Sequence, residues 1–188
     1  MMEEIWKPIK RYEGLYEVSN LGRVRSLTRS VRHTDHSTKV MQGQPLKPYL
    51  QPDGYRVVYL WKKAKKKMHR INRLVAQAFI PNPNNLPQVN HKDEKKENDF
   101  VFINPDGTVD YEKSNLEWCT AQYNNTYGSA IIKRAQKRGH KVRCIETGQV
   151  FYSGGEAARQ MHIQQRNINA VVNGKRNIAG GYHWERVE

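Results

Sequence analysis

Four polar residues in the middle of the chain have side-chain types and spacing suited to the hydrolysis of a phosphodiester: Asn90, His91, Asn115 and Asn124. This reaction needs a base that deprotonates water and a cation that stabilises the charge growing on the phosphate and on the leaving oxygen. A histidine side chain is mostly neutral at cellular pH, which is the state that a base requires. His91 is therefore the candidate general base.

The three asparagines have different expected roles. Asn90 and Asn124 carry hard carbonyl oxygens, which suit Mg²⁺ better than zinc and, being uncharged, would bind the ion weakly until a phosphate completes its coordination. Asn115 is better placed to hydrogen-bond across the loop that follows His91 and to fix the orientation of that ring. Asparagine is also common in turns, so a structural role is the alternative for each of the three taken alone.

Two strands and a helix must bring these residues together, because more than 30 residues separate the first from the last. Residues 88–91 and 116–120 have strand patterns, and Thr120 can cap a helix that begins at Ala121. Residues 100–111 alternate about a strong turn sequence, which predicts an extra hairpin inside the loop between the strands. Residues 73–80 have apolar side chains at helical spacing and predict a short core helix that ends at a proline.

The N-terminal third has the alternation of a small antiparallel sheet. Residues 16–27 predict a β-hairpin about an Asn-Leu-Gly turn, whereas residues 28–45 are polar and irregular. A second β pattern covers residues 46–50 and 55–61 and leads through a lysine-rich turn to residues 68–71. His69 precedes the core helix and is expected to pack or to cap it rather than to catalyse. The tip of this meander can enter a DNA groove and carries Lys62, Lys63, Lys65, Lys66 and Lys67.

The C-terminal third predicts a second small module. Residues 126–140 are a basic helical tail or linker that includes Lys133, Arg134, Lys137 and Arg138. Residues 141–145 and 149–152 form a hairpin, and two short helices follow, at 154–161 and 164–172, with helix-turn-helix spacing. Outward-facing residues of the second helix would be Gln165, Arg166 and Asn169, which are types that read base edges.

The net charge of +14 is unevenly distributed. Segments 1–60, 61–79, 80–128 and 129–188 carry net charges of +4, +7, −4 and +7. Two basic arms around an acidic, asparagine-rich centre suggest arms that grip phosphates and a centre that does something else. The alternative is that the lysines only keep the surface soluble. This explanation is the better one for any single lysine, but it is weaker for five lysines within six residues.

Composition excludes several classes of protein. No apolar run approaches the roughly 20 residues that cross a bilayer, and the first residues lack the features of a secretory signal, so we expect no membrane partner. Cys119 and Cys144 cannot form a disulfide framework or a four-cysteine zinc site, so we expect no structural zinc and a reducing, cytoplasmic environment.

Several runs also follow the order of a known family over nearly the whole chain: WKPI at 6–9, YEGLYEVSNLGRV at 12–24, HR at 69–70 with RLVAQAF at 73–79, VNHKD at 89–93 and NLEWCT at 115–120. Together they resemble the HNH homing endonucleases of phages and mobile introns. EAA at 156–158, NGK at 173–175 and GGYHW at 180–184 resemble the DNA-binding repeat that often follows such nuclease domains.

The resemblance implies a ββα-metal active site with one divalent ion, Mg²⁺ or Mn²⁺. By position, His91 would match the general base, Asn90 and Asn124 the metal-binding residues, and Asn115 the residue that braces the loop. Asn90 stands where relatives often have Asp or His, which implies weaker metal binding. Glu94 stands where many relatives have Gly, and the hairpin at 100–111 lengthens the loop.

These inferences predict a modular, elongated α+β protein in four parts. An N-terminal antiparallel β module (1–67) would contact DNA, and an HNH ββα-metal core (68–127) would follow. A basic linker (128–140) would lead to a C-terminal β-hairpin plus helix-turn-helix (141–188). The expected function is site-specific, homing-type cleavage of one or both strands of double-stranded DNA by a monomer, associated with the nucleoid of a bacterial or phage-infected host.

Two other functions remain open from the sequence. The chain could be a DNA-binding regulator with an inactive nuclease core, or an RNA-binding helper of intron splicing. The intact set of Asn90, His91, Asn115 and Asn124 favours the enzyme, because a pure binder has no chemical reason to hold it. An RNA-binding helper fits the charge equally well but predicts no metal site.

Overall fold

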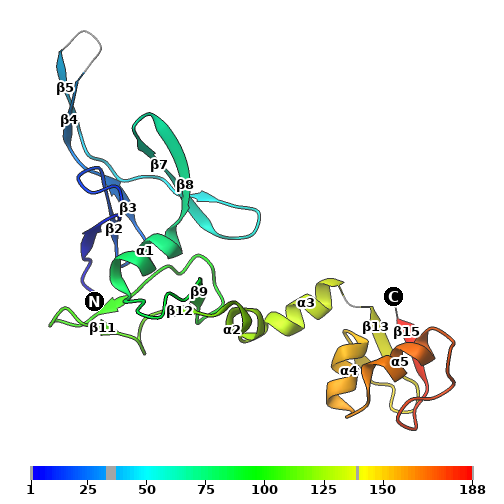
Figure 1. Cartoon of the computed structure of the whole chain (residues 1–188). Helices are drawn as coiled ribbons and strands as arrows, with labels where there is room; N and C mark the ends of the chain where they lie inside the picture. Colours follow the sequence, from blue (N-terminus) through cyan, green and yellow to red (C-terminus); the bar gives the residue numbers. More distant parts are fainter. Residues whose placement is uncertain (1, 33–36, 139, 188) are drawn as a thin grey trace. The chain divides into compact units, whose positions relative to one another are not determined.

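The computed structural model describes residues 2–32, 37–138 and 140–187. The chain folds as two compact units, residues 1–124 and 125–188, and each is described by itself (Figure 1). Both combine short helices with small sheets, which confirms a mixed helix-and-strand class. In the described residues, no helix is long and apolar enough to cross a membrane.

The first unit begins with a three-stranded antiparallel sheet in the order β1-β2-β3. Its strands are β1 (Trp6–Pro8), β2 (Tyr16–Ser19) and β3 (Val24–Ser26). The expected hairpin at 16–27 is confirmed as β2 and β3, which pair antiparallel.

The sequence suggested that residues 28–45 are irregular, but the structure shows two strands there. These residues contain a second hairpin, β4 (Arg29–Arg32) paired with β5 (Thr38–Met41). Each side chain of β5 is exposed, and those of β4 alternate only between exposed and half-buried. A hairpin that buries neither face has no alternation of apolar and polar residues, so its strands leave no pattern in the sequence.

The lysine-rich segment is mostly strand rather than turn. Sheet order β6-β7-β8 joins β6 (Tyr49–Leu50), β7 (Arg56–Lys62) and β8 (Lys65–Arg70). Only Lys63 and Ala64 form the turn, with φ of 51° and 58°, and Lys62 pairs directly with Lys65. His69 therefore lies in β8 and not at the start of the helix, and its Nε2 is 3.1 Å from the Tyr12 hydroxyl.

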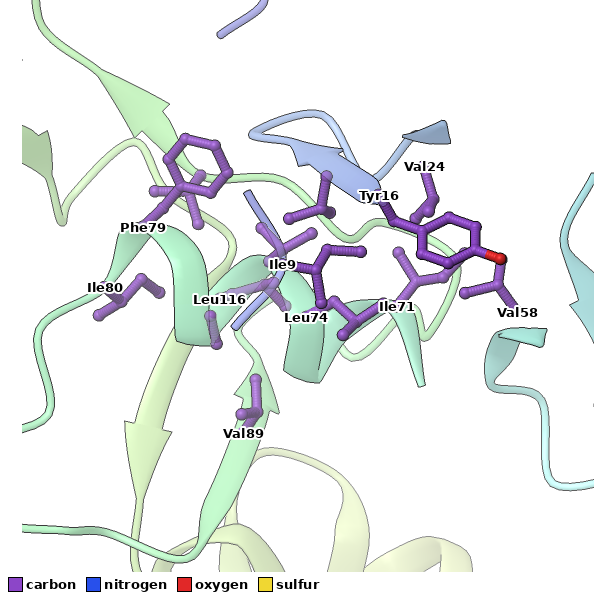
Figure 2. Close-up of a cluster of buried hydrophobic side chains, with 14 of the residues drawn as sticks. Ile9, Tyr16, Val24, Val58, Ile71, Leu74, Phe79, Ile80, Val89 and Leu116 are labelled. Carbon is purple, nitrogen blue, oxygen red and sulfur yellow. The ribbon is translucent and has the colours of Figure 1, made fainter. Parts of the chain in front are cut away.

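Helix α1 (Ile71–Phe79) confirms the expected core helix, and its side chains Ile71, Leu74 and Phe79 lie in a cluster of buried hydrophobic residues (Figure 2). Its buried face packs with side chains from the N-terminal sheets and from the later strands in one hydrophobic cluster, which includes Ile9, Tyr16, Val58, Leu74, Val89 and Leu116. Residues from both expected modules, 1–67 and 68–127, thus share one core. Whether they act as separate modules stays a prediction.

The central segment has the expected arrangement of elements. Strand β9 (Gln88–His91) pairs antiparallel with β12 (Leu116–Cys119), and helix α2 (Ala121–Thr126) follows. The Thr120 hydroxyl oxygen accepts from the Tyr123 N–H at 3.1 Å. Between the strands, β10 (Phe102–Ile103) and β11 (Val109–Asp110) form the expected extra hairpin.

The second unit begins with helix α3 (Ala130–Arg138) and contains a three-stranded sheet in the order β14-β13-β15. Its strands are β13 (Lys141–Cys144), β14 (Val150–Phe151) and β15 (Trp184–Val187), and the sequence had not indicated β15. Helices α4 (Gly154–Gln160) and α5 (Gln165–Val172) pack on this sheet around Phe151, Ile168 and Trp184. The Ser153 hydroxyl accepts from the Glu156 N–H and caps α4.

Two glycines provide a matched test of how tightly the β2–β3 turn packs. Gly14 and Gly22 have similar left-handed φ of 72° and 74°, but a Cβ at Gly14 would meet nothing within 4 Å. A Cβ at Gly22 would lie 2.7 Å from the Asp99 carbonyl oxygen and 2.9 Å from Arg56 Nη2. Gly14→Ala should lower the free energy of unfolding by about 1–2 kcal/mol through backbone strain. Gly22→Ala should cost on the order of 1–3 kcal/mol more through overpacking. Urea denaturation of both variants measures the difference, and equal costs would contradict this packing.

Candidate active site around His91

The register of β9 with β12 sets which side chains share a face. Asn90 lies opposite Glu117, and His91 lies opposite Leu116. Because side chains alternate along a strand, Asn90 and Glu117 project from one face of the pair and His91 from the other. The Asn90 side chain donates from Nδ2 to Glu117 Oε1 at 2.7 Å.

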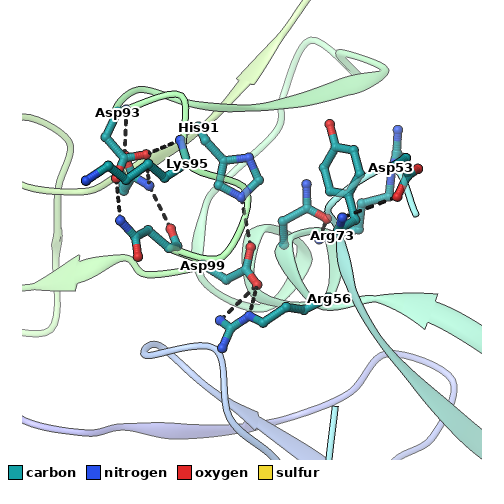
Figure 3. Close-up of polar contacts among 11 residues, drawn as sticks. Asp53, Arg56, Arg73, His91, Asp93, Lys95 and Asp99 are labelled. Carbon is teal, nitrogen blue, oxygen red and sulfur yellow. Dashed lines mark hydrogen bonds and ion pairs between the residues drawn. The ribbon is translucent and has the colours of Figure 1, made fainter. Parts of the chain in front are cut away.

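His91 is nearly buried, with 4% of its surface exposed, and one ring nitrogen is engaged. Its Nε2 lies 2.8 Å from Asp99 Oδ1, and Arg56 lies on the other side of that carboxylate (Figure 3). Arg56 donates to Asp99 Oδ2 from Nε at 3.1 Å and approaches it with Nη2 at 3.0 Å. The three side chains form a chain of contacts from a cation to the imidazole.

The other ring nitrogen of His91 is open. Among the described residues, Nδ1 has no hydrogen-bond partner, and no buried side-chain nitrogen or oxygen lacks one. Nδ1 therefore reaches the molecular surface. The Tyr55 ring lies beside the imidazole, with 6.0 Å between ring centroids, and burial raises the pKa of its hydroxyl.

Asn115 ties together the loop that follows His91. Its Oδ1 accepts from the Asp93 N–H at 3.0 Å, while its Nδ2 donates to Asp93 Oδ1 at 2.9 Å and to the Asn98 carbonyl at 2.7 Å. Asn98 Nδ2 in turn donates to Asp93 Oδ2 at 2.5 Å. The backbone of Lys92 also donates to the Asn115 carbonyl at 2.8 Å.

Asn124 is half-buried on α2. The groups that act on the Cys119 thiol show where the Asn124 backbone lies. Burial, together with the Glu117 charge, raises the pKa of the thiol, while the backbone amides of Asn124 and Asn90 act to lower it. Both amides therefore lie close to Cys119. Since Cys119 lies two residues along β12 from Glu117, on the same face, the backbone amide of Asn124 lies near the face that carries Asn90 and Glu117.

The side chains on this face fit a hard divalent cation. With Asn90 Nδ2 bonded to Glu117, the Asn90 Oδ1 remains as an oxygen donor next to the Glu117 carboxylate. Oxygen donors of this kind suit Mg²⁺ or Mn²⁺ rather than zinc. Within the described ranges, no group of three or more His, Cys, Asp or Glu side chains is arranged to hold a metal ion, so such a site depends on the amides.

Glu94 adopts a backbone conformation that favours glycine, the residue that the family resemblance implies at this position. Its φ is 59°, in the left-handed region, and its N–H donates to the His91 carbonyl at 3.0 Å. The loop thus keeps a glycine-type turn although it has a glutamate there, at a cost of about 1–2 kcal/mol of backbone strain.

The lysines of β7 and β8 are all exposed, although two of them are held in place. Lys62 donates to the Arg11 carbonyl, and the Lys66 ammonium lies 4.3 Å from the centre of the Tyr59 ring. Lys62 and Lys67 also line a recess with Lys10, Arg11, Tyr12 and His69. Burial, and then the Lys67 charge, lowers the pKa of His69.

The predicted DNA-binding residues of the second unit lie on two helices. Lys133, Arg134 and Lys137 are exposed on α3, where Arg134 donates to the Asn125 carbonyl. Arg138 ends α3, and its side chain lies outside the described ones.

On α5, Gln165, Arg166 and Asn169 are exposed, but two of them also contact α4. A Cβ on Gly154 would lie 2.6 Å from Asn169 Oδ1, and one on Gly155 would lie 3.3 Å from Gln165 Oε1. Gln165 and Asn169 therefore contact the first residues of α4 as well as facing the surface.

Three residues of the site were missed from the sequence: Arg56, Asp99 and Glu117. Asp99 and Arg56 are 43 residues apart, so only the tertiary fold brings them together. Glu117 had a detectable signal, since its place in β12 opposite Asn90 follows from the two strands that the sequence predicts.

Known proteins with similar sequences now bear on this geometry. Residues 4–61 match the model of the NUMOD4 motif. The chain is 34% identical over 136 residues to the DNA endonuclease I-HmuI of Bacillus phage SP01, covering 70% of this chain and 64% of that protein. It is 32% identical over 151 residues to an uncharacterised HNH endonuclease, L245, of Acanthamoeba polyphaga mimivirus, covering 76% of this chain and 40% of that protein.

The chain is therefore similar to HNH endonucleases over most of its length. It spans about two fifths and just under two thirds of the lengths of these two relatives. A solved structure described as DNA binding and cleavage by the HNH homing endonuclease I-HmuI matches 97% of this chain and 98% of the other, with 27% identity and a TM-score of 0.45. The NUMOD4 match includes Gly22 and Arg56, both of which pack against Asp99.

Asp93 accepts hydrogen bonds from Asn98, Asn115 and the Lys95 backbone, and we call this set of contacts the loop clasp. The loop clasp predicts a pH dependence of stability. Burial acts to raise the pKa of Asp93, but hydrogen bonds from Asn98, the Lys95 backbone and Asn115 outweigh it, so the folded-state pKa is lowered. A carboxylate with a lowered folded-state pKa stabilises the protein fully above its ordinary pKa of about 3.9 and loses that contribution as pH falls through the folded-state value.

Thermal unfolding of the wild type and of Asp93→Asn, measured from neutral to acidic pH, tests this. The melting temperature of the wild type should exceed that of the variant by a constant margin above about pH 5, and the margin should shrink below about pH 4. A margin that does not change with pH would rule out the charged clasp.

Proposed function

We propose that the chain is a site-specific, homing-type DNA endonuclease that hydrolyses phosphodiester bonds at His91. The observation that carries this proposal is the different surroundings of the two ring nitrogens of His91. One nitrogen contacts a buried carboxylate and the other reaches the surface. The preceding residue of the same strand, Asn90, presents an amide oxygen next to the Glu117 carboxylate on the other face of the strand pair. Sequence similarity to two endonucleases supports the proposal independently of the geometry.

His91 acts as the general base in the proposed reaction. Its Nδ1 accepts a proton from a water molecule, and the oxygen of that water attacks the scissile phosphorus. Asn115 keeps the following loop closed through its three side-chain hydrogen bonds, so the ring stays at a fixed position relative to the phosphate. General-base catalysis of this kind contributes about 10²–10⁴-fold to the rate.

Asn90 and Asn124 would hold one divalent ion, Mg²⁺ or Mn²⁺, with Glu117 next to Asn90. When bound, the ion supplies positive charge that stabilises the phosphate and the departing 3′ oxygen. The amide donors are neutral, so we infer that the ion binds weakly until DNA contributes a phosphate oxygen.

Double-stranded DNA is the proposed partner. The exposed lysines of β7 and β8 contact phosphates, as do the basic residues of α3, and Arg166 with Gln165 and Asn169 on α5 contacts the DNA as a second recognition surface. We propose a monomer located with the nucleoid, since a chain with two different DNA-contacting units has no need of a second copy.

Replacing the base provides the first test. His91→Ala should reduce Mg²⁺-dependent cleavage by about 100-fold or more while DNA affinity stays within about twofold, because the ring contributes to chemistry and not to phosphate contact. The assay incubates the protein with a plasmid library of randomised targets, with Mg²⁺ or with chelator, and sequences the products.

Circular dichroism of the variant controls for folding, and His91→Gln provides a larger, polar replacement if the alanine variant unfolds. Full cleavage by a folded His91 variant would remove it as the base. Metal-independent binding without any cleavage by the wild type would favour a DNA-binding regulator, and preferential binding of RNA would favour a splicing helper.

The basic tip provides a second test. Replacing Lys62, Lys63, Lys65, Lys66 and Lys67 with Gln should flatten the dependence of log affinity on log salt, by about 0.9 for each phosphate that is no longer neutralised. Lys113→Gln is the control, because the Lys113 ammonium pairs with Asp110 at 2.9 Å. Fluorescence anisotropy at several salt concentrations measures the slope, and an unchanged slope would make the tip a solvated surface only.

A further inference from the structure

The contact between Asp99 and His91 has a function beyond the roles assigned above. We propose that Asp99 is a positioning residue, which fixes the tautomer of His91 so that Nδ1 is free of hydrogen, and that Arg56 and the N-terminal β motif hold Asp99 in place for this purpose. This inference rests on the proposed nuclease function.

Both oxygens of Asp99 are committed to different partners. Oδ1 contacts His91 Nε2 at 2.8 Å, and Oδ2 receives the Arg56 guanidinium. A carboxylate paired with a guanidinium only accepts hydrogen bonds. The hydrogen of the neutral imidazole must therefore be on Nε2, which leaves the lone pair on Nδ1, the nitrogen that reaches the surface.

The burial of this carboxylate favours a function over a contribution to stability. The Asp99 side chain is 1% exposed and that of Arg56 is 27% exposed. Burying an ion pair costs desolvation energy that the pair often does not recover, and well-packed apolar residues in its place are commonly neutral or stabilising. A buried pair whose second carboxylate oxygen contacts a candidate catalytic imidazole therefore points to orientation of that ring.

The N-terminal motif encloses the pair from the other side. Gly22, at the β2–β3 turn, packs so closely on Asp99 and Arg56 that no side chain fits. The Asn20 carbonyl accepts from the Val101 N–H at 2.8 Å, and Asn20 Nδ2 donates to the Val101 carbonyl at 3.2 Å. Within the segment that matches NUMOD4, Asn20, Gly22 and Arg56 thus fix the position of Asp99.

The Asp99→Asn variant changes the tautomer with little change in shape. An asparagine has one acceptor and one donor group, and Arg56 can only donate. Arg56 would hold the amide oxygen on its own side, so the amide nitrogen of the new side chain would face His91 Nε2 and donate to it. Nε2 would then lose its hydrogen to Nδ1, and the nitrogen that should accept the proton from water would be blocked.

Nitrogen-15 NMR of the ring, in protein labelled at histidine, reads the tautomer without DNA or metal. The His91 signals are assigned by comparison with His91→Gln, and spectra are recorded at alkaline pH, where free histidine is neutral. In the wild type, Nδ1 should give the signal of a nitrogen without hydrogen and Nε2 that of a protonated one. Asp99→Asn should exchange the two signals.

Cleavage under single-turnover conditions provides the second measurement. Asp99→Asn should lower the cleavage rate by about 100-fold while the DNA dissociation constant changes less than about twofold. Adding Arg56→Met to Asp99→Asn releases the amide to rotate, because nothing then holds its oxygen, and should restore about tenfold of the lost rate. Glu17→Gln is the matched control: its carboxylate pairs with Arg25 at 2.7 Å in the same unit, and cleavage should not change.

The outcomes separate this inference from the proposed function. If the wild type does not cleave DNA, the proposed function fails, while the NMR exchange still decides whether Asp99 sets the tautomer. If the wild type cleaves but Asp99→Asn keeps both the original ring signals and full activity, the positioning role is wrong. A loss of activity that Arg56→Met does not relieve, with unchanged ring signals, overturns it as well.

Discussion

A single carboxylate connects the N-terminal sheets to the candidate site. Asp99 accepts from Arg56, which lies on β7, and contacts His91 at the end of β9. Each of these side chains is positioned by a different element, and the hydrophobic cluster around α1 holds those elements in one body. The geometry of the imidazole therefore depends on a core assembled from residues throughout the first 120 positions, and not on the local β9–β12–α2 motif alone.

The local elements of the site were accessible from the sequence because their signals are local. Strands β9 and β12 end at turn-forming residues, and Thr120 marks the start of α2, so the placement of Asn90, Asn115 and Asn124 on these elements followed from pattern alone. The β4–β5 hairpin and β15 were not accessible. The first buries neither face, and the second depends on pairing with β13 across some 40 residues.

The contacts of His91 were inaccessible for a different reason. A buried aspartate in a polar loop has the same sequence signature as an exposed one, and its cationic partner lies on a strand of the preceding sheet. Assigning Asp99 requires knowing that Gly22 and Arg56 pack against it, which is a property of the tertiary fold. The lysine-rich turn shows the converse error: charge composition suggested a loop, whereas cross-strand pairing with Leu60 and Trp61 makes most of it strand.

The structure also refines the meaning of the acidic central segment. Asp99 is neutralised by a cation from outside that segment, and Asp93 is engaged by the amides of the loop. Neither is available to a metal ion, which leaves Glu117 as the carboxylate beside Asn90. Two carboxylates of this segment, Asp93 and Asp99, therefore organise the loop and the base.

The β10–β11 hairpin is closed at its base by contacts that do not involve its tip. The Asn115 N–H donates to the Phe100 carbonyl at 3.2 Å, and the Phe102 N–H donates to the Ser114 hydroxyl at 2.9 Å. The ends of the inserted segment are thus fixed next to the loop clasp whatever the length of the hairpin between them. The turn at Asp106 and Gly107 is consequently a graft point, where an added peptide or domain can be carried by the chain without passing strain to His91.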